Sequence, residues 1–367
     1  MNPFIISAYK SPEYFCDRDV ETAKLKEAVE NGRNVLLYSL RRMGKTGLLK
    51  HLFYNLSKTS DYQLIYIDIS HTYSIEDFVS LLASAMLEAK KKVWYRKAME
   101  FLSGLRPTIE INPVTGQTEV FFRSADDKIN KQNLDSILMF FEKNKQKTII
   151  AIDEFQQISE YKEEGFEAYL RSKIQFLNNV VFIFTGSSRR MILSMFSDHG
   201  RPFYGSAQTL YLNEIDRNVY AGFVERMMKK TKYSISKDDI LDCMDWAEGH
   251  TWYVQTFFNR LWGKGVKKIN EKLIMEVKKE LLEEKSRDLT ELQRLIPVIQ
   301  FNLLSAIAKE SGIDKPTSKD FIQKYRLGSA SSISSALKVL MNKELVYYDD
   351  KKYHVYDVFL KRYLQSA

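Results

Sequence analysis

The sequence predicts an α/β fold in which helices cover a parallel sheet, followed by a helical region and a winged helix-turn-helix domain. Three observations lead to this expectation. Short apolar runs alternate with amphipathic segments through the first half of the chain, as in parallel strands joined by helices. The following segments have only helical periodicity, and the last ones read as three helices and a two-stranded wing.

Four apolar runs are the predicted strands of the sheet. Each is short, rich in β-branched or aromatic residues and apolar on both faces, which is typical of strands covered on both sides. TIEINPVTGQTEVFF at 108–122 alternates around a turn instead, and predicts a β-hairpin outside the sheet, to which we assign no chemistry. The four strands are NVLLYSL (34–40), LIYIDIS (64–70), TIIAIDEF (148–155) and VVFIFTGS (180–187).

Amphipathic segments with a period of 3.6 residues separate these strands and continue after them. The longest of them in the first half of the chain covers residues 75–102. Near the C-terminus, DDKK at 349–352 is the expected turn of the wing. We therefore expect three domains: an α/β core at 1–212, a helical lid domain at 213–290 and a winged helix domain at 291–367.

Composition excludes several classes of protein. Cys16 and Cys243 lie far apart with no CxxC pair, and the five histidines have no ligand spacing, so a disulfide scaffold or zinc site is not expected. The N-terminus lacks a signal-peptide pattern and no apolar run approaches 18 residues, so we expect a cytoplasmic protein without a membrane partner. The net charge of +8 favours an anionic partner such as nucleic acid. The same net charge is equally compatible with a basic cytosolic protein that has no such partner.

Gly44-Lys45-Thr46 follows a predicted strand and opens an amphipathic helix, which is the setting of a phosphate-binding loop. Glycine lets backbone N–H groups approach phosphate, lysine places its charge on the β- and γ-phosphates, and the threonine hydroxyl can ligate Mg²⁺. Ser39 occupies the slot of the first glycine in G-x-x-x-x-G-K-[ST], where a small residue suffices if its φ is negative. The candidate nucleotide-binding residues of this loop are Ser39, Arg41, Arg42, Met43, Gly44, Lys45, Thr46 and Gly47.

Asp153 and Glu154 end a predicted strand and are the expected acidic partners of the loop. Asp153 would hold Mg²⁺ together with Thr46, and Glu154 would orient and deprotonate the attacking water. The elements between Thr46 and Asp153 fit the ASCE type of P-loop NTPase, in which the acidic strand is not next to the loop strand.

A later strand ends in a polar cluster of Thr185, Ser187 and Ser188. In P-loop NTPases of the ASCE type, a strand lies between the strand before the phosphate loop and the acidic strand. A polar side chain at its end senses the γ-phosphate, and we assign Ser187 to nucleotide binding. Ser188 fits the N-cap of the next helix equally well. Arg201, in HGRPFYG, is a candidate catalytic residue beside Lys45 and Glu154, with a structural ion pair as the alternative.

Six segments together resemble the archaeal-type ATPases of the AAA+/STAND grouping over nearly the whole chain. The resemblance implies an ATPase core, a helical lid and a C-terminal winged helix, with ATP and Mg²⁺ as ligands. It places Phe15, Arg18 and Glu21 in an N-terminal motif near the nucleotide, with Arg18 as the contact. It also places His250 and Thr251 in a nucleotide-sensing lid motif whose usual proline is Thr251 here. The six segments are SLRRMGKTGLL, FCDRDVE, IIAIDEF, TGSS, RPFYG and EGHTWYVQ.

The last 53 residues, 315–367, hold ten Lys or Arg against five Asp or Glu. A basic winged helix could place SASSISSALKVL in a major groove of duplex DNA. Its alternative role is an interaction module for the lid or a partner protein, since the helix carries serine and not the usual base readers. The side chains expected on DNA are Ser329, Ser331, Ser332 and Ser334 of the helix and Lys351 and Lys352 of the wing.

The leading functional hypothesis is a slow, Mg²⁺-dependent P-loop ATPase that acts as a switch. ATP would close the lid and reposition the winged helix, on DNA in one version of the hypothesis. The alternative is a DNA-binding or protein-interaction regulator whose nucleotide site is structural and does not hydrolyse ATP. A GTPase lacks support because the chain has no N-K-x-D segment to read guanine.

Overall fold

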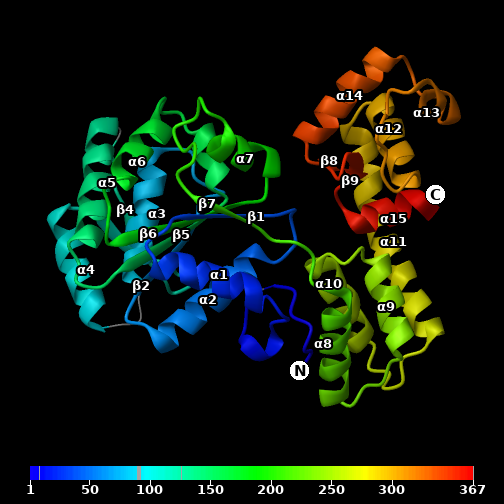
Figure 1. The fold of residues 1–367 in the computed structure, drawn as a ribbon, viewed down its shortest axis with the longest axis horizontal. Helices are drawn as coiled ribbons and strands as arrows, with labels where there is room; N and C mark the ends of the chain where they lie inside the picture. The colour runs from blue at the N-terminus through cyan, green and yellow to red at the C-terminus, as the bar shows by residue number, and fades with distance from the viewer. Residues whose placement is uncertain (8, 89–91, 125, 367) are drawn as a thin grey trace. The chain divides into compact units, whose positions relative to one another are not determined.

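The computed structural model describes residues 1–7, 9–88, 92–124 and 126–366. The chain forms two compact units, Ala8–Asn213 and a second unit that combines Met1–Ser7 with Glu214–Ala367. The first unit is an α/β core and the second is mainly helical (Figure 1). The predicted parallel sheet and C-terminal winged helix are both present.

The core contains a five-stranded parallel sheet with strand order β2-β5-β6-β1-β7. Strand β6 lies between β1 and β5, so the strand with the acidic pair is not a neighbour of the strand before the phosphate loop, as predicted. Parallel strands align their carboxyl ends at one edge, where ligands of such sheets bind. The strands are β1 (Val35–Tyr38), β2 (Gln63–Asp68), β5 (Thr148–Asp153), β6 (Val180–Gly186) and β7 (Gln208–Tyr211).

Strand β7 was not among the four predicted strands. It pairs with β1 at the edge of the sheet, and its residues are exposed or half-buried. Its sequence QTLY therefore lacks the continuous apolar run by which the buried strands can be recognised.

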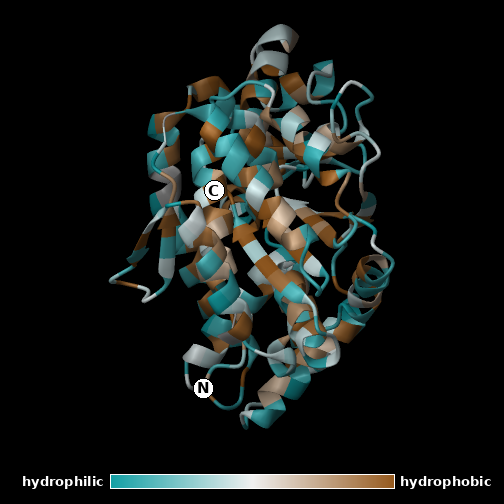
Figure 2. Ribbon diagram, turned by 90° about the vertical axis from the view of Figure 1, so that its left-hand side faces the viewer, coloured by the Kyte–Doolittle hydropathy of each residue, from teal (hydrophilic) through white to brown (hydrophobic). Residues whose placement is uncertain are grey.

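Helices cover both faces of the sheet. Strands carry long hydrophobic stretches, whereas the helices alternate between hydrophobic and hydrophilic residues (Figure 2). One hydrophobic cluster joins the sheet to helices α3–α7, and α1 and α2 lie together on the other face (Figure 1). The helices of the core are η1 (Pro12–Tyr14), α1 (Asp19–Glu30), α2 (Lys45–Thr59), α3 (Ile75–Leu87), α4 (Lys92–Gly104), α5 (Asp127–Glu142), η2 (Phe155–Glu160), α6 (Phe166–Ile174) and α7 (Arg189–Ser197).

The segment between β2 and β5 contains the helical pattern and the β-hairpin that the sequence predicts. The helical pattern at 75–102 forms two helices, α3 and α4. The predicted hairpin is β3 (Thr108–Ile111) and β4 (Thr118–Phe121), an antiparallel pair in a sheet of its own. The hairpin prediction is therefore confirmed.

The second unit follows the predicted order of helices and wing. Its wing is a hairpin whose turn residues Asp350 and Lys351 have φ values of 43° and 61°. None of the helices within the described residues is both long and apolar enough to cross a membrane. The elements are α8 (Arg217–Lys230), α9 (Lys237–Trp246), α10 (Thr251–Gly263), α11 (Glu271–Leu295), α12 (Val298–Lys309), α13 (Lys319–Lys324), α14 (Ala330–Asn342), β8 (Val346–Asp349), β9 (Lys352–Val355) and α15 (Val358–Ser366).

The structure groups residues differently from the expected domains at two places. Helix α11 runs through the expected boundary at 290, and the helical region and winged helix belong to one compact unit. The N-terminal residues, expected in the core, pack on α10, where Asn2 Nδ2 donates to Asn259 O at 2.9 Å and Asn259 Nδ2 donates to Phe4 O at 2.7 Å. The division into three domains stays a prediction.

Helix α15 is anchored on the turn between α9 and α10. Lys361, which is 4% exposed, forms an ion pair of 2.6 Å with Glu248 Oε1. Arg362 donates from Nε to Trp246 O at 2.9 Å, and the ring of Phe359 packs edge-on against Tyr253 at 4.8 Å. A buried ion pair and ring packing thus join the winged helix to the helical region within this unit.

Candidate ATP site

The phosphate loop connects β1 to α2 in the predicted strand–loop–helix arrangement. Two of its residues take the left-handed conformation, Arg42 with a φ of 67° and Gly44 with a φ of 94°. Ser39 does not have a positive φ, so its position does not require glycine. Helix α2 begins at Lys45 and directs the N–H groups of its first turn toward this loop.

Ser39 and Lys45 contact each other inside the loop. The Ser39 hydroxyl is fully buried and donates to Leu40 O at 2.7 Å. Lys45 is 7% exposed, and its Nζ lies 3.3 Å from Ser39 Oγ and 3.4 Å from Leu40 O. These neutral oxygens hold the ammonium by long hydrogen bonds, and phosphate oxygens would form stronger charge-assisted ones.

Asp153 lies at the end of β5 and receives hydrogen bonds on both carboxylate oxygens. Thr46 Oγ1 donates to Oδ2 at 2.8 Å, and Thr185 Oγ1 donates to Oδ1. The Glu154 N–H also donates to Oδ1, at 3.1 Å. The structure therefore brings together Thr46 and Asp153, the two residues predicted to hold Mg²⁺. Their hydroxyl and carboxylate oxygens are donors of the kind Mg²⁺ takes, so this pair fits the ion.

Tyr66 contacts the candidate site but was not among the residues predicted from the sequence. It lies on β2 opposite Ala151 of β5, and its hydroxyl donates to Asp153 Oδ2 at 2.9 Å. Burial, followed by the nearby Asp153 carboxylate, raises the pKa of Tyr66 above its ordinary value. The phenol therefore stays protonated and remains a donor to Asp153.

Glu154 and Ser187 face each other across the ends of β5 and β6. The Ser187 backbone N–H and hydroxyl both donate to Glu154 Oε2, at 3.1 and 2.8 Å. Arg41 Nε donates to Ser187 Oγ at 3.2 Å, so a loop arginine reaches the same group. Ser188 occupies the N-cap position of α7, but its side chain forms no capping hydrogen bond.

Arg18 supports the phosphate loop. It is 3% exposed, has a φ of 73°, and donates from NH2 to Met43 O at 3.3 Å. Its NH1 forms an ion pair of 3.0 Å with Glu21. A direct contact between Arg18 and nucleotide stays a prediction, and the observed contact places Arg18 against the loop backbone.

Phe15 packs on α2. Its ring stacks on the His51 ring at 4.3 Å, and a Cβ at Gly47 would lie 3.5 Å from Phe15 Cε2, which is ordinary contact. Burial lowers the pKa of His51. Phe15 thus links the N-terminal motif to the helix that follows the loop.

Arg201 has partners outside the phosphate loop. Its NH2 forms an ion pair of 2.6 Å with Glu167 Oε2 and donates to Ser159 Oγ at 3.3 Å. The structure therefore favours the ion-pair alternative for Arg201.

The lid motif lies in the second unit, at the start of α10. Gly249 has a φ of 67°, a left-handed conformation that favours glycine, and a Cβ there would lie 2.7 Å from Glu214 Oε2, so the Glu214 side chain would have to move. His250 is buried, with Nε2 at 3.9 Å from Glu214 Oε1. Burial, with smaller effects of Glu248 and Asp349, raises the pKa of Glu214. Nucleotide sensing by His250 and Thr251 stays a prediction.

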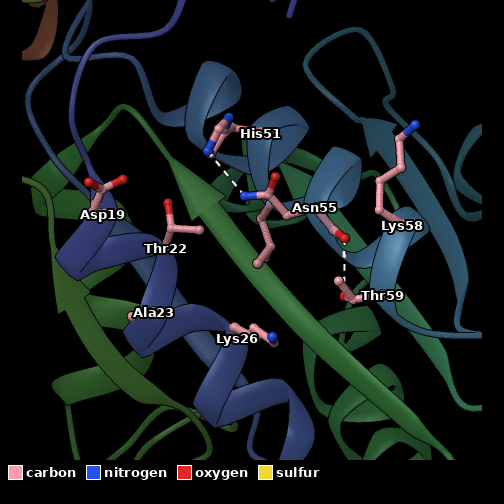
Figure 3. A pocket seen from close by; sticks show the side chains of 9 residues that line it. Asp19, Thr22, Ala23, Lys26, His51, Asn55, Lys58 and Thr59 are labelled. Carbon is pink, nitrogen blue, oxygen red and sulfur yellow. Dashed lines mark hydrogen bonds between the residues drawn. The ribbon is translucent and has the colours of Figure 1, made fainter. Parts of the chain in front are cut away.

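A pocket of about 350 Å³ lies between α1 and α2 (Figure 3). Asn55 and His51 form a hydrogen bond of 3.1 Å on its wall. None of its lining residues belongs to the phosphate loop or to the acidic strand end, so it is separate from the candidate ATP site. The lining residues are Asp19, Thr22, Ala23, Lys26, His51, Leu52, Asn55, Lys58 and Thr59.

Comparison with known proteins agrees with this geometry. An ATPase domain predominantly from Archaea matches residues 15–257, and a probable winged helix domain matches residues 288–366. An uncharacterized ATP-binding protein of Methanocaldococcus jannaschii is 27% identical over 171 residues, which cover 43% of this chain and 47% of that protein. The chain thus spans about half the length of this curated relative.

Two solved structures share the fold over nearly their whole length. The Walker-type ATPase of Pyrococcus abyssi has a TM-score of 0.70 at 19% identity, with 99% of each chain covered. The ORC2 protein of Aeropyrum pernix, solved as ADPNP–ADP complexes, has a TM-score of 0.60 at 13% identity, with 100% of this chain and 98% of that chain covered. The chain therefore belongs to the family of ATPase domains found predominantly in Archaea, followed by a winged helix domain.

Proposed function

We propose that this protein is a slow, Mg²⁺-dependent ATPase that hydrolyses ATP to ADP and phosphate. The observation that carries the proposal is the 2.8 Å contact between Thr46 and Asp153, with Glu154 adjacent at the same strand end. A phosphate loop, a pair of metal-binding oxygens and a carboxylate base are the parts this reaction needs. Membership of an ATPase family supports the same reaction.

Each residue has a defined task in this proposal. Lys45 and the N–H groups at the start of α2 bind the β- and γ-phosphates, and Arg41 donates to Ser187 Oγ at the end of β6. Thr46 and Asp153 would hold Mg²⁺, which neutralises charge on the phosphate oxygens. Glu154 takes a proton from water as the water oxygen bonds to the γ-phosphorus. The bond from that phosphorus to the bridging oxygen breaks, ADP leaves, and the proton ends on phosphate.

Replacing Glu154 by glutamine is expected to leave ATP binding within about twofold and to reduce turnover by about 10²- to 10⁴-fold, because the amide cannot accept the proton. Phosphate release under excess ATP and Mg²⁺ measures turnover, and titration of a fluorescent ATP analogue measures binding. Glu160→Gln, an exposed carboxylate at the end of η2, is the matched control. Equal turnover in the Glu154→Gln and wild-type proteins would remove Glu154 as the base.

We further propose that ATP acts as a switch on the second unit. The ion pair of Lys361 with Glu248 joins α15 to the turn before α10, so the helical region and winged helix are expected to move together. This adds to the hypothesis of lid closure and winged-helix repositioning that the two changes occur as one movement.

The proposed anionic partner of the winged helix is duplex DNA. Ser331, Lys338, Lys351 and Lys352 are exposed on α14 and the wing. Ser329 has a different role, since it caps α14 by accepting a hydrogen bond of 3.2 Å from the Ser332 N–H. Part of the basic charge is internal: Lys361 and Arg362 pair with Glu248, and Lys324 pairs with Glu310.

Replacing Lys351 and Lys352 together by alanine is expected to weaken DNA binding and to reduce the salt slope, log Kd against log salt, by about 2, because each lysine releases about one counterion. Fluorescence anisotropy of a labelled duplex between 50 and 200 mM salt, roughly the range where such contacts weaken most, measures the slope. The double variant Lys272→Ala with Lys279→Ala, on exposed positions of α11, is the control. An unchanged slope in the wing variant would favour the partner-protein alternative.

A further inference from the structure

Gln156 lies two residues after the proposed base and is almost fully buried. Its exposed fraction is 9%, and its Nε2 donates to Glu154 Oε2 at 2.5 Å. Its Oε1 is buried and has no hydrogen-bond partner among the described residues. The bond that Gln156 makes is therefore directed at the proposed base, while its other polar atom has no partner among the described residues.

Gly186, the last residue of β6, leaves the space that Gln156 occupies. A Cβ at position 186 would lie 2.2 Å from Gln156 Oε1, closer than any real contact. The φ of Gly186 is not positive, so the backbone conformation does not demand glycine. The absence of a side chain at Gly186 therefore allows the Gln156 carboxamide to reach Glu154.

The two oxygens of the Glu154 carboxylate have different surroundings. Oε2 accepts three hydrogen bonds, from Gln156 Nε2 and from the backbone N–H and hydroxyl of Ser187. Oε1 accepts none from the part of the chain that the structure describes. The Glu154 backbone takes the left-handed conformation, with φ 57° and ψ 40°, an uncommon state that marks functional sites.

We propose that Gln156 is a positioning residue for ATP hydrolysis: with Ser187 it anchors Glu154 Oε2, which leaves Oε1 directed at the attacking water. This inference rests on the proposed ATPase function. Three donors on one oxygen fix the rotation of the carboxylate. Proton transfer needs such fixed geometry, since a displacement of about 1 Å costs about 10²-fold in rate.

The test replaces Gln156 by methionine, which fills a similar volume but donates no hydrogen bond. We expect kcat to fall at least about tenfold, with KM and ATP affinity within about twofold and an unfolding temperature that is not lowered. Gln157→Met is the matched control, because its Nε2 donates to Thr72 O at 3.0 Å, away from Glu154. Wild-type kcat in a folded Gln156→Met protein would overturn the inference.

A double-mutant cycle keeps the test decisive if the methionine variant folds poorly. Gly186→Ala alone is expected to lower kcat, because its Cβ displaces the carboxamide. In the Gln156→Ala background the same change should lower kcat no further, because the carboxamide is gone. Additive losses in the cycle would overturn the role of Gly186 and Gln156 as one unit.

The two proposals fail in different ways. If the wild-type protein does not hydrolyse ATP, the proposed function fails and this inference fails with it. If wild-type turnover depends on Glu154 but is indifferent to Gln156, only the inference fails.

Discussion

Replacing Lys45 by alanine is expected to weaken ATP binding at least about 100-fold, or about 2.8 kcal/mol. The Lys45 ammonium is nearly buried among the loop oxygens of Ser39 and Leu40, where solvent screens it little. Alanine removes the charge that would meet the β- and γ-phosphates, and each such charge-assisted bond contributes about 1.5–3 kcal/mol. Calorimetric titration with ATP and Mg²⁺ measures the loss directly.

Lys58→Ala is the matched control, because Lys58 lies on the same helix but in its last turn, away from the loop. Its ATP affinity should equal that of the wild type. The Lys45 variant should keep the wild-type unfolding temperature without nucleotide and lose the increase that ATP causes. Undiminished ATP affinity after Lys45→Ala would remove the phosphate loop from the binding site.

Most of the core could be predicted because its parts are local. A continuous apolar run defines a strand covered on both faces, and β1, β5 and β6 each lie within the predicted ranges. The edge strand β7 has no such run and was missed. The boundary expected at 290 falls inside α11, whose helical pattern continues to Leu295 without a break in periodicity.

Some residues of the candidate site could likewise be predicted from local sequence, and others could not. Lys45, Thr46, Asp153 and Glu154 lie in short motifs next to strand ends, so their convergence follows from the parallel sheet. The contact between Tyr66 and Asp153 depends on the register of β2 against β5, which places Asp68 opposite Asp153. A single sequence does not specify that register.

Gln156 and Ser39 show that a local sequence pattern can predict what a residue's own backbone requires but does not predict its side-chain contacts. The contact of Gln156 with Glu154 depends on the space that Gly186 leaves on another strand, which no local pattern reveals. The condition stated for Ser39 concerned only its own backbone, and it is met, since Ser39 lacks a positive φ; its role in nucleotide binding stays a prediction. Its contact with Lys45 gives this serine a role that glycine could not fill.

Replacing Lys361 by alanine is expected to destabilise the second unit by about 3 kcal/mol. Loss of one partner from a buried ion pair costs about 3–5 kcal/mol, because the other charge stays desolvated without compensation. The lower end of this range applies to Lys361, since the Glu248 side chain is 24% exposed and Arg362 remains 3.4 Å from it. Urea unfolding followed by tryptophan fluorescence reports mainly on this unit, because Trp246, Trp252 and Trp262 lie in it and only Trp94 lies in the core, and Trp246 packs against Phe359 at 5.4 Å.

The exposed Lys352→Ala is the control and should change stability by less than about 0.5 kcal/mol. The double variant Lys361→Met with Glu248→Gln removes both charges of the buried pair, and it should recover part of the loss, since Arg362 keeps its bonds to Trp246 O and Asp245 O. A Lys361→Ala protein as stable as the wild type would show that the remaining contacts, the Arg362 bond to Trp246 O and the ring packing at Phe359, hold α15 without this ion pair. The buried ion pair would then not be what makes the helical region and winged helix move as one body, and that argument for the proposed switch would fail.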